Sequence, residues 1–152
     1  MPVDVATSRQ ILRDARSIAV LGMKPDSRSE RAAFYIPEYL ASVGYELIPV
    51  PTRYPDATVI LGRAVVRDLA GVRADVVSVF VKPEEQPPLL PALAVVDAPV
   101  IWFQSGFMHR EVAAALEVAG KVVVHACIGC RRAEITPALE PLDGQISGAP
   151  DR

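Results

Sequence analysis

The chain of 152 residues is 51% hydrophobic and 22% charged, which is typical of one globular domain and excludes the disordered and disulfide-rich classes. Its formal net charge of -2 provides no extended positive field for a phosphate backbone, so we expect no nucleic-acid partner. The sequence contains no signal-peptide pattern and no apolar run of about 20 residues, which favours the cytoplasm and a protein without membrane contact.

The first part of the chain alternates helical and strand patterns. An amphipathic helix capped by Ser8 is expected at residues 8–16, and a continuously apolar strand follows at residues 17–22. The next helix is expected at residues 29–43. A kink or a division into two helices is expected at Pro37, because proline removes a backbone donor and clashes with the preceding turn.

The remaining apolar runs continue this alternation. The other expected elements are strands at residues 45–50, 74–81, 98–103 and 121–126, a short crossover at 61–65, a helical turn at 66–70, and helices at 82–96 and 109–119. We therefore predict a single α/β domain at residues 1–135, Rossmann-like and doubly wound, with a mostly parallel sheet of five or six strands. Residues 136–152, rich in Pro, Gly and Asp, are expected to form a loosely ordered C-terminal tail.

Ligands of such sheets bind outside the carboxyl ends of the strands, so the loops after the strands are the candidate site. Gly22 ends the first strand, Ser29 is placed to cap the next helix, and Lys24, Arg28 and Arg31 add positive charge. A helix N-terminus with nearby cations is a phosphate site, although a solvated basic loop would have the same composition. The G-x-G-x-x-G fingerprint is absent, which disfavours a standard dehydrogenase site.

Three later strand ends also carry candidate ligand contacts. Arg53 stands where dinucleotide enzymes carry an acidic residue, which favours a phosphorylated ribose, although an ion pair with a carboxylate such as Asp56 is equally consistent. Phe80 and Trp102 belong to strand ends that would line a cleft, with core packing as the alternative for both aromatic side chains.

Several segments stand in a characteristic order: IAVLGMKPDSRSER, GYELIPVPTRYPD, LGRAV, ADVVSVFVKPEE, VIWFQSGF and the stretch around Cys127. Together they span roughly residues 17–135 and resemble the small CoA-binding domain proteins. These are single-domain relatives of the amino-terminal domain of the succinyl-CoA synthetase alpha subunit. The resemblance implies that coenzyme A, or an acyl-CoA, lies across the carboxyl ends of the strands.

The resemblance also implies three groups of ligand contacts. The phosphate contacts are Gly22, Met23, Lys24 and Ser29, assisted by Arg28 or Arg31, with Arg53 at the phosphorylated ribose. The contacts beside the nucleotide or the pantetheine arm are Phe80, Val81 and Lys82, and those beside the arm are Gln104, Ser105 and Gly106. Neither ligation nor transfer is implied, because the synthetase keeps its phosphorylated histidine in a separate domain.

Cys127 and Cys130 form a C-x-x-C pattern, with His125 two residues before it. In a reducing compartment both cysteines are expected as thiols. We favour a structural or incidental role, since free cysteine behaves as a small buried hydrophobe. Thiol redox chemistry and metal binding remain alternatives, although zinc would lack an obvious fourth ligand.

The sequence thus predicts a module that binds CoA or an acyl-CoA, senses it or presents it to an unidentified protein partner, and has no catalytic residues of its own. The alternative from the enzyme class is a nucleotide-dependent or thiol oxidoreductase that uses the same cleft with Cys127 or Cys130. A Rossmann module that only binds other proteins is a third hypothesis.

Overall fold

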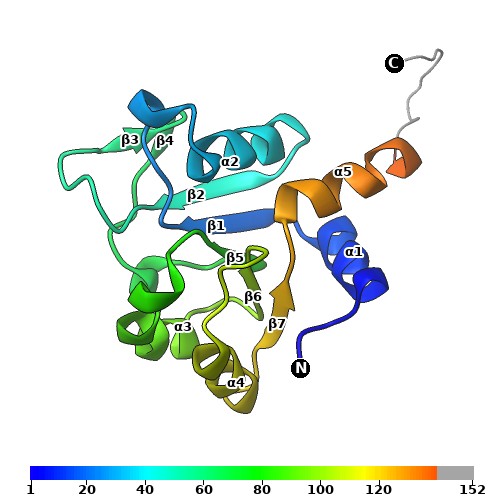
Figure 1. The fold of residues 1–152 in the computed structure, drawn as a ribbon. Coiled ribbons are helices and arrows are strands. Elements are labelled where there is room, and N and C mark those ends of the chain that lie inside the picture. Colours follow the sequence, from blue (N-terminus) through cyan, green and yellow to red (C-terminus); the bar gives the residue numbers. More distant parts are fainter. Residues whose placement is uncertain (140–152) are drawn as a thin grey trace.

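Five parallel strands form the central sheet of the computed structural model, which describes residues 1–139 (Figure 1). In the order β2-β1-β5-β6-β7 the strands are Glu46–Val50, Ser17–Leu21, Val76–Val79, Val100–Phe103 and Val122–His125. Almost every residue of β1, β5 and β6 is buried, as expected for strands that are covered on both faces. The predicted single-domain, Rossmann-like α/β fold is confirmed.

Helices cover the sheet on both sides (Figure 1). The helices on one face are α1 (Val5–Asp14), α2 (Ala32–Ser42) and α5 (Ile128–Leu139), and those on the other are α3 (Leu90–Val95) and α4 (Arg110–Val118). Alternate residues of the strands point into two separate cores, so Trp102 packs on the α1, α2 and α5 side and Phe103 on the α3 and α4 side. None of the helices within residues 1–139 is long and apolar enough to cross a membrane.

Two helices begin at residues other than those expected. α1 begins at Val5 because the Asp4 carboxylate accepts the Thr7 N–H at 2.8 Å, whereas the predicted cap Ser8 is buried inside the helix. α2 begins after Arg31, because Asp26–Arg28 forms a separate 3₁₀ turn. Ser29 therefore caps no helix and is exposed.

Pro37 lies inside a single helix, so the division into two helices, one of the two outcomes predicted, does not occur. Proline at this position leaves the Ala33 carbonyl without its helical donor. The backbone N–H of Lys24 supplies the missing hydrogen bond, at 3.1 Å. The defect in α2 is therefore satisfied by the loop that follows β1.

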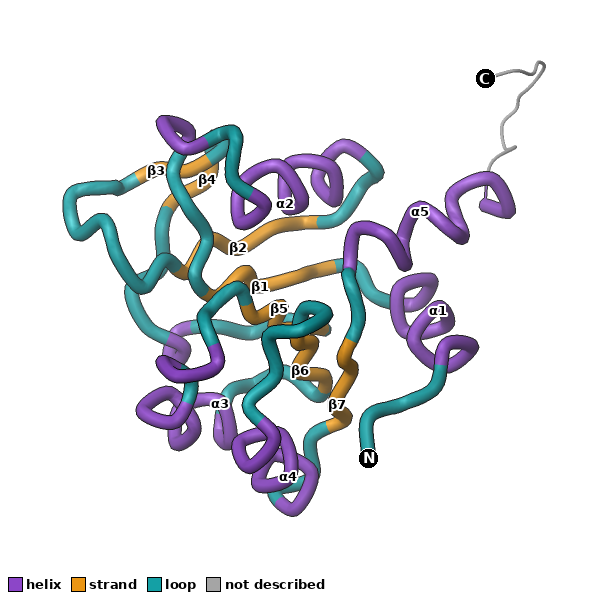
Figure 2. Tube along the Cα trace, viewed as in Figure 1, coloured by secondary structure: helices purple, strands orange, loops and turns teal. Residues whose placement is uncertain are grey.

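The crossover predicted at residues 61–65 is instead a small antiparallel hairpin of β3 (Val59–Ile60) and β4 (Arg63–Ala64), visible beside β2 in Figure 2. Leu61 and Gly62 both have positive φ, at 52° and 74°, which is the geometry of a two-residue type I′ turn. The Asp26 carboxylate accepts the Leu61 N–H at 3.0 Å and so attaches the hairpin to the 3₁₀ turn.

Three further segments differ from the expectations. The helix expected at 82–96 is two 3₁₀ turns, Pro83–Glu85 and Pro87–Leu89, followed by the short α3. The predicted turn at 66–70 is a 3₁₀ turn at Leu69–Gly71. α5 has no counterpart in the sequence-based prediction and continues to Leu139, and the rest of the segment predicted as a tail, residues 140–152, lies outside the described residues.

Candidate functional site

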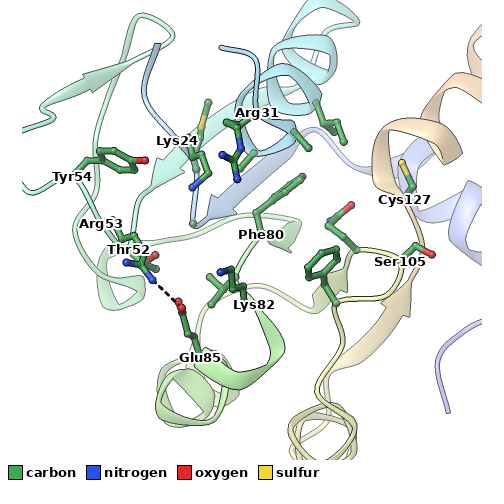
Figure 3. Close-up of a pocket in the computed structure, with 18 residues that line it drawn as sticks. Lys24, Arg31, Thr52, Arg53, Tyr54, Phe80, Lys82, Glu85, Ser105 and Cys127 are labelled. Atoms are coloured by element: carbon green, nitrogen blue, oxygen red, sulfur yellow. Dashed lines mark hydrogen bonds and ion pairs between the residues drawn. The ribbon is translucent and has the colours of Figure 1, made fainter. Parts of the chain in front are cut away.

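A cavity of about 410 Å³ opens at the carboxyl ends of the strands (Figure 3). The sequence-predicted residues that line it are Gly22, Met23, Lys24, Arg31, Arg53, Phe80, Val81, Lys82, Gln104 and Ser105. They come from the loops after four strands, as the topology of a parallel sheet requires. The structure thus brings together most of the residues that the sequence nominated.

Three nominated residues are not among those that line the cavity. Arg28 and Ser29 are exposed beside the 3₁₀ turn before α2, because that helix begins later than predicted. Gly106 is exposed and donates its N–H to Nε2 of His125 at 3.1 Å. The role of every nominated residue as a ligand contact remains a prediction.

The cavity also contains residues that sequence reasoning did not assign to it. They are Ala32, Ala33, Ile36, Thr52, Tyr54, Glu85 and Phe107. Cys127 also lines the cavity, a place that only the oxidoreductase alternative gave it. Thr52 and Tyr54 flank Arg53 on one loop, and Phe107 is two residues from Ser105. These three residues could therefore have been assigned to the cavity from their proximity in sequence to residues already predicted to line it. Ile36 comes from the second turn of α2, and its place depends on how that helix packs.

Positive side chains gather at one end of the cavity, where Lys24, Arg31 and Arg53 lie (Figure 3). The Lys24 ammonium is 5.7 Å from the centre of the Tyr54 ring, within range of a cation–π interaction. Tyr54 has a positive φ of 61°, and its loop is held by the Arg67 guanidinium, which donates to the carbonyls of Tyr54, Pro55 and Ala57.

Arg53 already has a carboxylate partner, but not the one considered from the sequence. Its Nη2 donates to Oε2 of Glu85 at 2.8 Å, and Asp56 is not its partner (Figure 3). Both side chains remain partly exposed, so solvent screens this ion pair and its contribution to stability is small. The guanidinium is therefore available to exchange Glu85 for another anion.

Gly22 brings two strand ends into close contact beneath the cationic loop. Its φ is +87°, and a Cβ atom at this position would lie 2.8 Å from the Phe80 carbonyl oxygen and 2.9 Å from Cγ2 of Val81. Glycine is required here both for the backbone conformation and for the space. The loop that carries Lys24 is consequently seated directly against the end of β5.

The other end of the cavity is formed by residues that follow β6 and β7. The Gln104 amide is buried: its Nε2 donates to Oγ of Ser78 at 2.9 Å, and its Oε1 accepts the Ile128 N–H at 3.1 Å. Gln104 thus positions the first residue of α5, and both the nitrogen and the oxygen of its amide are hydrogen-bonded within the protein. Phe80 is half-buried in the cavity wall, whereas Trp102 is a core residue, fully buried and donating to the Ala126 carbonyl.

Cys127 lines this second end and is paired with Cys130 as a disulfide, which corrects the expectation of free thiols. The first turn of α5 brings residues three apart onto the same face, and this places the two sulfur atoms together. Within residues 1–139 no group of three His, Cys, Asp or Glu side chains is arranged to hold a metal ion.

Residues 16–133 match the family model described as a CoA binding domain. The chain belongs to this CoA-binding domain family. Its relatives include the uncharacterized protein YneT of Bacillus subtilis, which is 29% identical over 119 residues and aligned over 78% of this chain and 86% of YneT.

Solved structures resemble this CoA-binding domain along most of its length. The cell-free ID.343 structure from Thermus thermophilus has 30% identity and a TM-score of 0.77, with 88% of this chain and 99% of the other covered. A hypothetical protein from Pyrococcus horikoshii OT3 has 27% identity and a TM-score of 0.78, with coverages of 88% and 95%.

Proposed function

We propose that the protein binds coenzyme A or an acyl-CoA across the carboxyl ends of the strands. The observation that carries this proposal is the gathering of Lys24, Arg31 and Arg53 at one end of a cavity whose walls are mostly apolar. Coenzyme A has three phosphate groups at its nucleotide end and a flexible arm that ends in a thiol. A cationic end and a less charged end match these two parts.

The phosphate groups are assigned to the loop after β1 and to Arg53. Gly22 and Met23 allow close approach of the backbone, while Lys24 and Arg31 supply charge for the diphosphate. Arg53 is assigned to the phosphate on the ribose, where a planar guanidinium is suited to binding two oxygens. Arg28 and Ser29 are outside the cavity and take no part in this assignment.

The arm is assigned to the remaining length of the cavity. Phe80 and Val81 provide apolar contact, Lys82 borders the middle of the cavity, and Ser105 lies toward the far end (Figure 3). This assignment makes the protein a module that senses CoA or presents it to a protein partner. A nicotinamide-dependent enzyme has less support, because the phosphate loop contains one glycine where the dinucleotide fingerprint has three.

The assignment is tested by calorimetric titration of CoA and dephospho-CoA, which lacks the ribose phosphate. Lys24→Ala and Arg53→Ala should each weaken CoA binding about tenfold, since each removes a charged hydrogen-bonding partner. Arg53→Ala should also bind CoA and dephospho-CoA equally. Arg73→Ala is the matched control, since Arg73 is an exposed arginine paired with Asp97 and does not line the cavity.

Unchanged affinity of both cavity variants would refute the site. Tighter binding of NAD than of CoA by the unmodified protein would favour the oxidoreductase alternative, and no binding of either would favour a module that recognises only proteins.

A further inference from the structure

Cys127, which forms a disulfide with Cys130, lies at the end of the cavity opposite the cations (Figure 3). Cys127 is half-buried and lines the cavity, whereas Cys130 is exposed and is not among the lining residues. The two sulfur atoms are therefore unequal: one is presented to a bound ligand and the other to solvent.

If the phosphates occupy the cationic end, the arm leads toward Cys127. Between Arg53 and Cys127 the cavity is bordered by Phe80, Lys82 and Ser105, all of which follow the inner strands of the sheet. The arm of coenzyme A ends in a thiol, and a thiol is the group that reacts with a disulfide. This orientation brings the reactive end of the ligand to the reactive pair of the protein.

The surroundings of Cys127 suit it to such a reaction. The backbone N–H of Cys130 donates to Sγ of Cys127 at 3.2 Å, and Cys127 immediately precedes α5, a helix of 12 residues. A hydrogen-bond donor and a helix N-terminus both favour a thiolate over a thiol. Cys127 is accordingly the better nucleophile when the pair is reduced.

We propose that Cys127 and Cys130 exchange disulfides with the CoA thiol, an inference that rests on the proposed CoA site. In the oxidised protein the CoA thiolate attacks Sγ of Cys127, the bond to Cys130 breaks, and Cys130 leaves as a thiolate that takes up a proton. The product is a mixed disulfide of Cys127 with CoA. In the reverse direction Cys130 attacks Sγ of Cys127 and releases CoA as the thiol, so electrons and protons balance without another reactant.

The test uses the variant Cys130→Ser, which retains Cys127 but cannot resolve the mixed disulfide. The reduced variant is mixed with CoA disulfide or, separately, with glutathione disulfide, and the adducts are followed by intact-protein mass spectrometry without reductant. The CoA adduct should form on Cys127 at least about tenfold faster than the glutathione adduct, because binding in the cavity raises the effective concentration of the reacting sulfur. Peptide mapping locates the adduct, and reductant should remove it.

Two companion variants separate the cavity from general thiol reactivity. Adding Lys24→Ala to Cys130→Ser should slow the CoA adduct toward the glutathione rate and leave the glutathione adduct unchanged. Cys127→Ser, which keeps only Cys130, should react with the two disulfides at similar rates, because Cys130 does not line the cavity.

Equal rates of CoA and glutathione adduct formation on Cys130→Ser would overturn the exchange. Calorimetry of the unmodified protein with S-methyl-CoA, which has no free thiol, reports on the binding site alone. Binding of that analogue together with equal adduct rates would refute the exchange and leave the CoA site intact, whereas no binding would refute both.

Discussion

Gly22 is the residue at which the loop after β1 meets the end of β5. Gly22→Ala should lower the free energy of unfolding by about 2–4 kcal/mol, through the cost of a positive φ and a forced shift of the Phe80 backbone. Gly120→Ala is the matched control, because Gly120 has a similar φ of +94° and its added Cβ would meet no atom within 4 Å.

Urea unfolding of both variants separates strain from crowding. In the control, Gly120→Ala, the free energy of unfolding should fall by only about 1–2 kcal/mol, which is the cost of a positive φ for a residue with a side chain. If both variants lose the same free energy of unfolding, the ends of β1 and β5 can move apart at little cost. That result would contradict close packing of the loop after β1 against the end of β5.

Glu85 is a carboxylate in a cavity assigned to a ligand with several phosphates. It holds Arg53 at 2.8 Å and must give up this partner when a phosphate takes its place. Glu85→Gln should therefore tighten CoA binding roughly two- to fivefold, which is the range expected from a partly exposed ion pair. Asp97→Asn, which removes the partner of Arg73, is the control and should leave calorimetric affinity unchanged. Weaker binding by Glu85→Gln would show that Glu85 holds Arg53 in its binding position.

At the scale of elements, α2 and the phosphate loop share a hydrogen bond that exists because of Pro37. In Pro37→Ala the new N–H should donate to the Ala33 carbonyl and compete with Lys24 for it. CoA affinity should fall about threefold, since the loop is less firmly held, while the helix gains a bond and overall stability changes little. Pro91→Ala, in the first turn of α3, is the control and should not affect affinity. Unchanged affinity in Pro37→Ala would show that the Lys24 N–H bond does not position the loop.

The parallel strands were predictable because each is a short apolar run buried on both faces. The residues at which the helices begin were less predictable. Asp4 and Ser8 are both acceptable N-caps, and only the packing of the following turns selects Asp4. α5 was missed because Ile128–Leu139 has no regular apolar stripe and contains a glycine and a proline. Its place is set by the Gln104 side chain and by contacts with α1 and α2.

The candidate site was predictable to the extent that it follows from topology. Loops after parallel strands converge, so Lys24, Arg53 and Lys82 could be assigned to one cleft from the order of the strands. The hydrogen-bond partners within that cleft could not be predicted. The pairing of Arg53 with Glu85 depends on the conformation of the 3₁₀ turn at Pro83–Glu85, which the proline-rich sequence does not determine.

At the scale of the molecule, Asp75 joins the two halves of the sheet. Its carboxylate accepts the N–H groups of Arg16, at 2.7 Å, and of Ser17, at 3.1 Å, where β1 begins beside β5. The hydrogen bond from the Arg16 N–H, followed by that from Ser17, lowers the pKa of Asp75 below its ordinary value despite some opposing desolvation. This contribution to stability is present above the unfolded-state pKa and is lost as pH falls through the lower folded-state pKa.

Asp75→Asn should consequently lower the free energy of unfolding at neutral pH by about 0.5–1 kcal/mol, the amount expected for an exposed charged group. The difference between the two proteins should shrink as pH falls below about 4, where the carboxylate of the unfolded chain becomes protonated. Urea midpoints from pH 7 to pH 2 measure this. A constant difference over that range would contradict an ionised carboxylate as the source of the stabilisation.

The strand order has a consequence for a chain that is still being synthesised. β1 is an inner strand of the sheet: β2 pairs with one of its edges, and the other edge has no partner until β5 has been synthesised. During that interval the nascent chain has a β1–α2–β2 unit with an open backbone edge and apolar residues such as Ile18 and Val20 on it. Such an edge is a template for pairing with the wrong strand or with another chain. The period of synthesis between β2 and β5 is therefore one in which the polypeptide is prone to aggregate.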